Sequence, residues 1–421
     1  MIQLPVSYGP SSHAIHAGEG SDDVARAHVA PIYQTSAFGF ASAEEGRRQF
    51  AGEAKGYIYS RWHNPTIEVV ERKVAALEAM DLRTRSGDGE PVSVAGMAFS
   101  SGMAAISSVL YALLRPGDVV ITHGGLYGGT TELFQTLLPQ MGVDVRWVPM
   151  QSAEQLDADI RGLAAAGASG GRPGLVYIET PTNPALDLRD IAMVAEVAHA
   201  HGLKLVADNT FATPILQQPL ALGVDFVVHS TTKYLNGHGT IIGGMVVSPH
   251  GEFISGDLWH HRKLRGGNAS PFDAWILNQG LKTLALRMER HCSNALAVAR
   301  WLEARHEISA VRYPGLESDP YHGLARKQMK GFGGMIAFEL QGGLQAGAAL
   351  MDAVRLCSLA VSLGTVDTLI SHPASMTHSM VPAEERIKHG ITDGLVRLSV
   401  GLEDVDDILD DLDRALKRSG A

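Results

Sequence analysis

Residues 174–210, GLVYIETPTNPALDLRDIAMVAEVAHAHGLKLVADNT, decide the fold class of this chain. The stretch begins and ends with short apolar runs, at 174–180 and 203–210, that are typical of buried strands. Between them, residues 185–202 carry apolar side chains at helical spacing and end at Gly202, a residue suited to a helix C-terminus. A strand, a helix and a second strand in this order predict two parallel strands joined by a helix.

Apolar runs on both sides of this stretch extend the same alternation. They predict further strands at 119–123, 145–150, 224–230 and 241–248. Continuous apolar strands that alternate with helices favour a mainly parallel central sheet with helices on both faces. We therefore expect an α/β fold.

Two changes in pattern divide the chain. Residues 1–63 are rich in glycine and polar side chains and predict an arm, after which a helix begins at Asn64. One long helix starts near residue 270 and leads into a second pattern, with strands near 334–340 and 395–400. The expected units are an arm at 1–63, a central α/β domain at 64–280 and a smaller α/β domain at 281–421.

The composition argues against nucleic-acid and membrane partners. The 421 residues include 35 Lys and Arg against 45 Asp and Glu, a net charge of −10, without the basic stretch that a phosphate backbone or an anionic bilayer requires. No apolar run reaches the ~18 residues needed to span a bilayer. Two cysteines, Cys292 and Cys357, and an amino terminus without signal-peptide features predict a cytoplasmic location.

Lys233 and Asp208 are the strongest candidates for chemistry. Each stands at the carboxyl end of a predicted buried strand, and ligands of open α/β sheets bind at the carboxyl ends of strands. An unprotonated lysine condenses with a carbonyl group, and a carboxylate keeps a pyridine nitrogen protonated, which together suit pyridoxal phosphate (PLP). Taken alone, either residue is more typical of a surface lysine or a turn aspartate. Their order and spacing favour a shared site.

A phosphate site is predicted beside these two residues. Ser101 and Gly102 open a helix, so free backbone N–H groups and the positive end of the helix dipole meet at Gly102 and Met103. Ser230 and Thr232 add hydroxyl donors near the same anion. For the helix segment alone, an ordinary N-capped helix is the alternative.

Three more side chains stand at or just past the ends of strands that meet the same sheet edge. Tyr127 stands among glycines in LYGGT, which permit close approach of a flat ring, and Glu179 and Asn183 belong to ETPTNP. Histidine pairs such as His199 and His201 have no third ligand at metal-binding spacing, and no GxGxxG joins a strand to a helix. We therefore expect neither a metal site nor a dinucleotide site.

Taken together, these segments resemble the Cys/Met-metabolism family of PLP enzymes, which includes cystathionine γ-synthases, cystathionine γ-lyases, methionine γ-lyases and O-acylhomoserine sulfhydrylases. The motifs that carry the resemblance are AIHAG, PIYQTSAF, YSRWHNPT, SSGMAAI, LYGGT, VADNTFATP, VHSTTKYLNGHG, LRMERH, HPASMTHS and GLVRLSVGLED. The resemblance runs nearly end to end. It implies PLP as cofactor and the α/β fold of PLP-dependent transferases, fold type I or aspartate aminotransferase-like, with a mainly parallel central sheet and a smaller α/β C-terminal domain.

The resemblance also implies roles for individual residues. Lys233 matches the lysine that holds the cofactor and moves protons, Asp208 the partner of its ring nitrogen, and Tyr127 the ring that stacks on it and acts as an acid or base. The further residues implied to bind the cofactor are Ser101, Gly102, Met103, Glu179, Ser230 and Thr232.

Residues from two further regions are implied to complete the site. Tyr59 and Arg61 in the arm match residues that reach the phosphate of a neighbouring subunit, which implies a homotetramer, a dimer of dimers with active sites shared across the dimer interface. Arg397 matches the residue that holds the α-carboxylate of an amino-acid substrate, and its planar fork suits such pairing. Ser362 and Asn183 are implied to lie beside it.

Within the family, the chain is most similar to methionine γ-lyases. Cystathionine-handling members carry a glutamate directly before the serine that corresponds to Ser362, whereas this chain has Val361, as methionine γ-lyases do. Gly129 stands where methionine γ-lyases typically carry a cysteine, which predicts more room for a larger or more polar γ-substituent. We expect γ-elimination on a γ-substituted L-amino acid such as methionine or homocysteine, giving 2-oxobutyrate, ammonia and a thiol.

Other activities use the same residues. One is γ-replacement on an O-acylhomoserine, as in O-acylhomoserine sulfhydrylases and cystathionine γ-synthases, and another is γ-elimination from canavanine or another O-linked amino acid. A catalytically silent PLP-fold binding protein is disfavoured, because Lys233, Asp208, Tyr127 and Arg397 are all present.

The segment HHRKLRGGNAS, residues 260–270, departs from the corresponding LKDMTG pattern of γ-lyases. Arg262, Lys263 and Arg265 make it unusually basic. We expect a solvated loop rather than a substrate contact.

Overall fold

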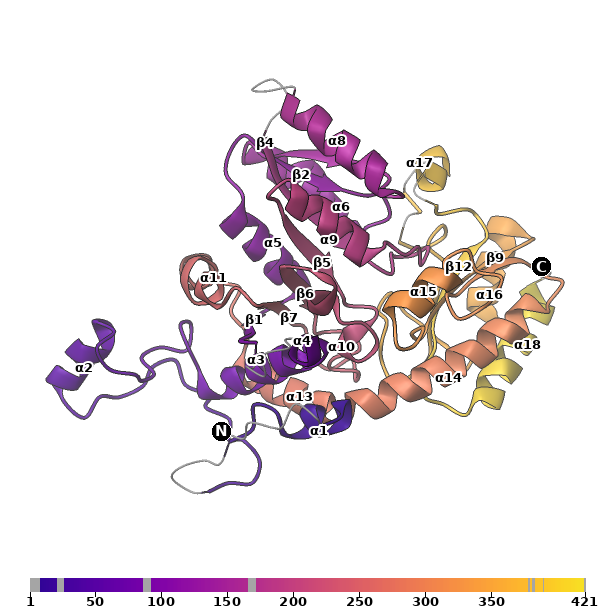
Figure 1. Cartoon of the computed structure of the whole chain (residues 1–421). Helices are drawn as coiled ribbons and strands as arrows, with labels where there is room; N and C mark the ends of the chain where they lie inside the picture. The colour runs from indigo at the N-terminus through magenta and orange to yellow at the C-terminus, as the bar shows by residue number, and fades with distance from the viewer. Residues whose placement is uncertain are drawn as a thin grey trace.

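Two β-sheets organise the chain (Figure 1). The computed structural model describes residues 8–20, 26–85, 92–165, 172–377, 379–380, 383–388 and 390–419. A seven-stranded sheet has the order β1-β7-β6-β5-β4-β2-β3, and a five-stranded sheet has the order β10-β11-β12-β9-β8. The strands are β1 (Ala95–Phe99), β2 (Asp118–Thr122), β3 (Asp144–Trp147), β4 (Arg172–Glu179), β5 (Lys204–Asp208), β6 (Phe226–Ser230), β7 (Gly244–Ser248), β8 (Ile308–Arg312), β9 (Met335–Leu340), β10 (Ser358–Leu359), β11 (Leu369–Ser371) and β12 (Leu395–Ser399).

The larger sheet is mainly parallel, which confirms the expectation. Strands β3, β2, β4, β5 and β6 pair in parallel, whereas β7 is antiparallel to both of its neighbours, β1 and β6. The central strands are buried on both faces, as continuous apolar runs predict. Parallel strands of this kind need long crossover connections, and helices supply them.

The helices surround the two sheets. In chain order they are α1 (Pro10–His16), α2 (Ala43–Phe50), α3 (Pro65–Glu78), α4 (Met80–Arg85), α5 (Gly102–Leu113), α6 (Gly128–Glu132), α7 (Leu138–Gln140), α8 (Ala153–Ala165), α9 (Ile191–Ala200), α10 (Thr213–Leu216), α11 (Gly251–Phe253), α12 (Trp259–Arg265), α13 (Pro271–Lys282), α14 (Leu284–Glu303), α15 (His322–Gln328), α16 (Gly343–Ala353), α17 (Ala383–Lys388) and α18 (Val405–Ser419). Turns of π-helix follow α6 and α11 at Leu133–Leu137 and Ile254–Leu258, and a 3-10 turn lies at Pro219–Leu222. No helix of the described residues is long and apolar enough to cross a membrane.

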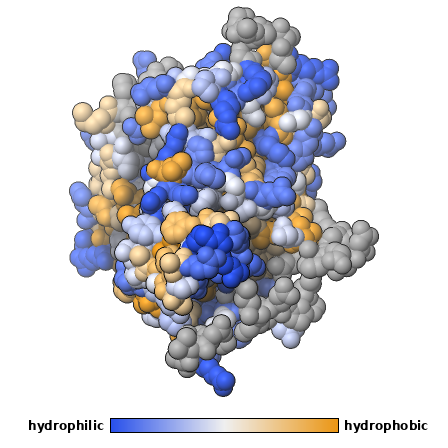
Figure 2. Space-filling view, turned by 90° about the vertical axis from the view of Figure 1, so that its left-hand side faces the viewer, coloured by the Kyte–Doolittle hydropathy of each residue, from blue (hydrophilic) through white to orange (hydrophobic). Residues whose placement is uncertain are grey.

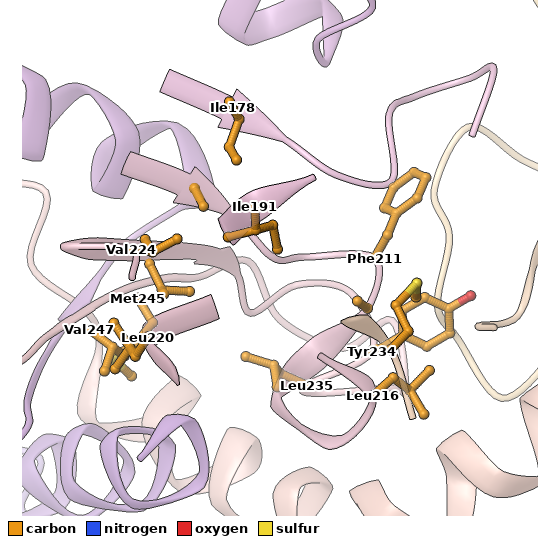
Figure 3. Packing of buried hydrophobic residues seen from close by; sticks show 14 of the residues in the cluster. Ile178, Ile191, Phe211, Leu216, Leu220, Val224, Tyr234, Leu235, Met245 and Val247 are labelled. Atoms are coloured by element: carbon orange, nitrogen blue, oxygen red, sulfur yellow. The ribbon is translucent and has the colours of Figure 1, made fainter. Parts of the chain in front are cut away.

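Each face of the larger sheet has its own apolar core. On one face, α3 and α9 pack against strand residues that include Ile178 of β4 and Met245 of β7, and Tyr234 joins this cluster beyond β6 (Figure 3). On the other face, α5 packs its buried Val109 against a cluster that contains Val228. Because both faces are covered, the free edge for ligands is the carboxyl end of the parallel strands.

Some predicted elements differ from the observed ones. The helix predicted at 185–202 is shorter, because α9 begins only after Asp190, whose carboxylate accepts a hydrogen bond from Met193 N–H at 3.1 Å as an N-cap. The residues before it turn around Thr182, whose hydroxyl accepts from Asp187 N–H at 2.9 Å. Gly202 follows α9 with a φ of 69°, as expected for a helix C-terminus.

The long helix predicted from residue 270 is two helices, α13 and α14. They separate at Thr283, whose hydroxyl bonds back to Gly280 O at 3.2 Å. Strands β1, β8, β10 and β11 were not predicted from the sequence. β1 carries small residues in place of a β-branched run, and β10 has only two residues.

The N-terminal segment extends away from the body of the molecule. In Figure 1, α2 lies at the end of this extension, and Figure 2 looks onto the face that carries it, where hydrophobic residues alternate with hydrophilic ones. Phe40, Phe50 and Tyr59 are among its exposed large apolar side chains. Exposed aromatic residues at this density are typical of a surface that another chain covers.

Candidate active site

The amine of Lys233 lies at the centre of the candidate site. Lys233 follows β6 by three residues and is partly buried. Its Nζ donates a hydrogen bond to Ser362 Oγ over 3.1 Å. Burial, followed by the positive charge of Arg397, lowers the pKa of Lys233 to about 8. Near neutral pH, a much larger fraction of this amine is uncharged than in a solvated lysine, and the uncharged form is the one that acts as a nucleophile or base.

Arg397 in β12 forms a second anchor next to this amine. Its Nη1 donates to Asn183 Oδ1 at 3.1 Å, and its Nη2 donates to the carbonyl oxygens of Val361 at 2.8 Å and Ser362 at 3.2 Å. Burial lowers the pKa of Arg397 to about 10, which still leaves the guanidinium charged at neutral pH. The structure therefore brings the predicted carboxylate-binding residues to the same place as the lysine.

Asp208 and Glu179 form a pair of buried carboxyl groups at the ends of β5 and β4. They are partners in the strand register and are 8% and 5% exposed. Burial raises the pKa of both groups, and the charge of Asp208 raises that of Glu179 further. Asp208 accepts from Thr210 N–H at 2.9 Å, and Glu179 accepts from Tyr127 N–H at 2.8 Å. A carboxylate buried in this way gains from a cationic partner, so Asp208 suits a protonated ring nitrogen.

The predicted anion site lies at the amino terminus of α5. Ser101 is the N-cap, and its hydroxyl accepts from Ala104 N–H at 3.0 Å. The N–H groups of Gly102 and Met103 precede the first intrahelical hydrogen bond, which leaves them available to a ligand. A Cβ on Gly102 would lie 2.9 Å from the Cβ of Ser230, so only glycine lets α5 and β6 approach this closely.

Thr232 has a different arrangement from the other predicted phosphate ligands. Its hydroxyl accepts from Gly243 N–H at 3.0 Å and donates to Gly243 O at 3.3 Å. The hydroxyl of Thr232 therefore supports the loop before β7.

These side chains fit PLP. When bound, PLP supplies an electron-withdrawing ring that stabilises negative charge on the substrate carbon. The N-terminus of α5 would hold its phosphate, Asp208 its ring nitrogen and Lys233 its aldehyde carbon. The buried carboxyl of Asp208, left with a raised pKa, and the glycine contact between α5 and β6 are the two observations that support this fit.

Tyr127 borders the site at the start of α6, and its side chain is 47% exposed. A Cβ built on Gly129 would lie 2.7 Å from Tyr127 Cε1 and 3.2 Å from Met103 Sδ. The ring of Tyr127 therefore fills the space next to the glycine. The extra room predicted from Gly129 is not open in this structure, because the Tyr127 ring lies there.

Tyr59 and Arg61 are not brought to Lys233 of the same chain. The Arg61 guanidinium lies 5.5 Å from the centroid of the Tyr59 ring, and its Nη1 donates to the carbonyl oxygen of Lys263 in α12. Both side chains therefore lie at the junction of the arm with α12.

The basic segment is neither a solvated loop nor, by its contacts, part of the substrate site. Residues 259–265 form α12, and Arg262 is only 4% exposed, with its Nη1 bonded to Glu71 Oε1 at 2.8 Å. The Arg265 guanidinium lies 4.6 Å from the centroid of the Tyr111 ring. The sequence could not show that these charges have partners more than a hundred residues away.

Two polar residues that sequence reasoning missed hold the site together. Thr210 donates its N–H to Asp208, and its hydroxyl accepts from Ser230 N–H at 2.9 Å, so it links the end of β5 to the end of β6. His123 Nε2 accepts from Glu179 N–H at 3.0 Å, and burial lowers the pKa of His123 to about 3. Thr210 was recognisable from its place two residues after an aspartate at a strand end, a spacing that favours a side-chain turn.

A buried polar network lies beneath the ends of β5 and β6. His229 Nε2 and Glu78 Oε1 are 2.6 Å apart, and both side chains are fully buried. Asn209 Nδ2 donates to Glu78 at 3.0 Å, and Gln217 Nε2 donates to Asn209 Oδ1 at 3.0 Å. Because Asn209 follows Asp208 directly, the network fixes the turn that presents the carboxylate.

The histidine pair considered for a metal has other partners. His199 Nε2 lies 2.9 Å from Asp225, and His201 Nε2 lies 2.8 Å from Asp157. Across the part of the chain that the structure describes, no group of three or more His, Cys, Asp or Glu side chains is placed to hold a metal ion.

Comparison with known proteins connects this geometry with one family. The family described as Cys/Met metabolism PLP-dependent enzyme matches residues 11–417. The L-methionine γ-lyase of Pseudomonas putida is 47% identical over 411 residues, which cover 98% of each chain. The solved cystathionine γ-synthase of Xanthomonas oryzae pv. oryzae, in complex with aminoacrylate and cysteine, has a TM-score of 0.87 at 39% identity and covers 98% of this chain and 99% of its own.

A further solved structure, the cystathionine γ-lyase of Lactobacillus plantarum complexed with L-serine, has a TM-score of 0.87 at 37% identity, with coverage of 98% of this chain and 100% of its own. These likenesses confirm the fold class, PLP as the cofactor and the assignment as a PLP-dependent lyase. The chain therefore belongs to the Cys/Met metabolism family of PLP-dependent enzymes.

Proposed function

We propose that this enzyme catalyses γ-elimination on an L-amino acid with a sulfur substituent at Cγ, with methionine or homocysteine as substrate. For methionine, the amino acid and one water give methanethiol, ammonia and 2-oxobutyrate. The similarity to an L-methionine γ-lyase over 98% of both chains supports this choice.

The observation that carries the proposal is the placement of Lys233 and Arg397 on either side of Ser362. Lys233 Nζ bonds the Ser362 hydroxyl, and Arg397 Nη2 bonds the Ser362 carbonyl. An amino acid whose α-carboxylate pairs with Arg397 therefore has its α-carbon near the lysine amine. This arrangement suits removal of the Cα proton by an uncharged Lys233.

The remaining steps can be assigned to the same side chains. Lys233 would have to give up the Cα proton, for which bound PLP would offer an acceptor, before it removes one proton from Cβ. A proton delivered to sulfur would then let the thiol leave from Cγ. Tyr127 would supply that proton, because its ring borders the site and its side chain is partly exposed. Arg397, with Asn183 fixing its Nη1, would keep the carboxylate in place throughout.

Val361 supports a substrate with an uncharged end. Its carbonyl oxygen is used by Arg397, and its side chain is 62% exposed. An apolar side chain offers no charge to the distal ammonium group of cystathionine, whereas it is compatible with the thioether of methionine.

A second candidate is γ-replacement, in which a thiol adds to the intermediate formed after the leaving group departs. The likeness to a solved cystathionine γ-synthase supports it, with a TM-score of 0.87. Canavanine and other O-linked amino acids are supported less well than methionine or homocysteine, because the Tyr127 ring occupies the space beside Gly129.

A substrate panel tests the choice. Purified enzyme with PLP is offered L-methionine, L-homocysteine, cystathionine, canavanine and O-acetylhomoserine, with and without a thiol, while 2-oxobutyrate, homoserine and thioethers are measured. We expect 2-oxobutyrate from methionine or homocysteine as the main product. Dominant thioether formation from O-acetylhomoserine would reject the lyase in favour of replacement.

A variant tests the assignment of the lysine. Lys233→Ala is expected to lose both activity and the borohydride-reducible link to PLP, while Lys330→Ala, at a surface lysine paired with Asp81, retains both. A Lys233→Ala protein that still forms a reducible link to PLP would contradict the assignment.

We further propose that the enzyme is a homotetramer in which Tyr59 and Arg61 of one chain reach the PLP phosphate of another. The arm's exposed aromatic side chains and the position of Arg61 away from Lys233 of its own chain support this proposal. Mixed oligomers of Arg61→Ala and Lys233→Ala chains should regain activity that neither variant has alone. Absence of any gain on mixing would argue that each chain completes its own site.

A further inference from the structure

Residues 61–63 of the arm are held by α12 through side-chain and backbone contacts. We call this contact the arm clasp. Its members are Arg61, Trp62 and His63 from the arm and Trp259, Arg262 and Lys263 from α12.

The ammonium group of Lys263 lies between two indole rings in the clasp. Its Nζ is 4.4 Å from the centroid of the Trp62 ring and 4.6 Å from that of Trp259. The two rings meet edge to face, with centroids 6.2 Å apart and planes at 74°. A cation at this distance from the ring faces is attracted by both, and indole is the aromatic group that binds cations most strongly.

The backbone of Trp62 is fixed by the same helix. Its carbonyl oxygen accepts from Trp259 Nε1 at 3.3 Å and from Arg262 Nη2 at 2.8 Å. Arg262 is in turn paired with Glu71 of α3 at 2.8 Å, so this part of the clasp is anchored in the central domain. The His63 ring stacks on Trp259 at 5.7 Å with planes 10° apart.

Lys263 acts on the arm at two points. Its side chain holds the Trp62 ring, and its carbonyl oxygen accepts a hydrogen bond from Arg61 Nη1. Arg61 has further N–H groups, so this bond orients the guanidinium without using all its donors. The direction of Arg61, and of Tyr59 beside it, is therefore set within a single chain before a second chain arrives.

We propose that Lys263 is a positioning residue that presents Tyr59 and Arg61 to the PLP phosphate of a second copy of this chain. The inference rests on the proposed function, in which the arm completes a neighbouring site. An arm already ordered in each chain loses less conformational entropy when the chains associate, so phosphate binding in the partner's site is tighter. The other two basic residues of the segment have partners of their own, Arg262 with Glu71 and Arg265 with the Tyr111 ring.

The first test measures the affinity of the oligomer for PLP, which is added to protein prepared free of it. Lys263→Met keeps much of the apolar contact and removes the charge, Lys263→Gln provides a polar alternative should the methionine protein fail to fold, and Lys263→Arg restores a cation that stacks on indole. The matched control is Lys327→Met, at an exposed lysine paired with Asp190. We expect PLP affinity to fall about tenfold or more in Lys263→Met and Lys263→Gln, and to be largely restored in Lys263→Arg.

Two further readouts separate positioning from general stability. Hydrogen exchange at residues 57–63 of the PLP-free protein should accelerate in Lys263→Met, whereas its thermal unfolding temperature and its oligomeric state should change little. Unchanged PLP affinity in Lys263→Met and Lys263→Gln, or a loss of affinity fully matched by Lys327→Met, would overturn the inference.

A mixed oligomer shows whether the effect crosses between chains. A tagged chain with Lys233→Ala and Lys263→Met is combined with an untagged chain that has neither change, and PLP is trapped with borohydride, which labels only the untagged chain. Labelling of that chain should require more PLP than when its tagged partner carries Lys233→Ala alone. Equal labelling in the two mixtures would overturn the inference.

Arg61→Ala distinguishes this inference from the proposal on which it rests. If Arg61→Ala leaves PLP affinity unchanged, the shared site itself is wrong. If Arg61→Ala weakens PLP binding and the Lys263 variants do not, the shared site stands and only the role of Lys263 is refuted.

Discussion

The charge state of Lys233 depends on two effects, its burial and the positive charge of Arg397. Burial removes water from the amine, and Arg397 adds a positive charge nearby, so that the pKa falls to about 8 from the usual 10.5. Both effects act on the protein without cofactor. The residue is therefore prepared to react before PLP arrives.

A pH dependence follows from this pKa. The uncharged amine is the form that attacks the PLP aldehyde, so the rate of PLP capture by the cofactor-free enzyme should rise about tenfold per pH unit below pH 8 and level off above it. Stopped-flow absorbance between pH 6 and 9 measures this rate. In Arg397→Met the midpoint should move to higher pH, because one of the two causes is removed. A rate that does not change between pH 6.5 and 8 would contradict the lowered pKa.

Replacement of Asp208 tests the partner of the ring nitrogen. Asp208→Asn keeps the shape and the hydrogen bond from Thr210 but has no negative charge, so kcat should fall by about 100-fold or more while the protein stays folded. Steady-state kinetics with circular dichroism checks this. The control is Asp225→Asn, which removes the charge of another buried carboxylate. Asp225 is paired with Lys204 outside the site, so this change should reduce stability rather than kcat. Equal kcat losses in both variants would reject a specific role for Asp208.

At the scale of single residues, the sequence predicted what lies at strand ends. Lys233 and Asp208 stand just past apolar runs, and their positions follow from the rule that ligands bind at the carboxyl ends of parallel strands. The Glu78–His229 pair was not predictable, because its members are 151 residues apart and each has an unremarkable local sequence. The position of the Tyr127 ring against Gly129 was not predictable either, since it depends on how a side chain packs.

At the scale of elements, the start of α5 gives a prediction with a matched control. Gly102→Ala places a Cβ 2.9 Å from that of Ser230, so α5 or β6 must shift, and PLP affinity should fall by about tenfold or more. Gly162→Ala, in α8 with nothing within 4 Å of the new Cβ, should leave affinity unchanged and stabilise the protein by about 0.5–1 kcal/mol. Titration with PLP and urea unfolding measure the two effects. Normal affinity in Gly102→Ala would reject the phosphate site.

The connection between α18 and the smaller sheet gives a prediction about stability. The Asp411 carboxylate accepts from the backbone N–H groups of Arg355, Leu356 and Cys357, each at 2.9 Å. Burial opposes its charge, but these bonds prevail and lower the pKa of Asp411. Asp411→Asn should therefore cost about 2–3 kcal/mol of unfolding free energy at pH 7 in urea.

The contribution of Asp411 to stability depends on pH. Because the pKa of Asp411 is lower in the folded chain, its contribution is complete above the unfolded value of about 3.9 and disappears as the pH falls through the folded value. The difference in unfolding free energy between wild type and Asp411→Asn should therefore disappear at acid pH. Asp404→Asn, at an exposed residue paired with Arg290, should change stability by less than about 0.5 kcal/mol. An equal loss in both variants would contradict this account.

Elements with a strong pattern were predicted well. Asn64 can cap a helix through its side chain, and a proline follows it, so the sequence predicts a helix start there. The helix α3 does begin there, and Asn64 Oδ1 accepts a hydrogen bond from Thr66 N–H. Strands with small or few residues, such as β1 and β10, were missed because partner strands rather than local propensity stabilise them. The break between α13 and α14 at Thr283 was missed because the helical spacing of apolar residues continues through it.

At the scale of the whole molecule, the alternation of strands and helices was sufficient to predict the architecture. It specified a covered parallel sheet, and the covering helices were found on both faces. The antiparallel placement of β7 between β1 and β6 did not follow from the sequence, because a buried strand has the same composition in either direction. The division at residues 63 and 280 stays a prediction.

An arm that completes a neighbour's site makes cofactor binding depend on protein concentration. If Tyr59 and Arg61 of one chain complete the site of another, as we propose, dilution below the concentration at which chains associate should release PLP. Absorbance of bound PLP, measured together with sedimentation velocity over a dilution series, checks this. PLP retained on single chains with unchanged affinity would contradict the shared site.

The lowered pKa of Lys233 has a consequence for the protein before PLP binds. Because a larger fraction of this amine is uncharged than in an ordinary surface lysine, we expect cyanate, reducing sugars and other aldehydes to modify it faster than they modify surface lysines. Bound PLP would therefore protect Lys233 from modification. In protein purified without PLP, we expect covalent modification during storage to occur first at Lys233.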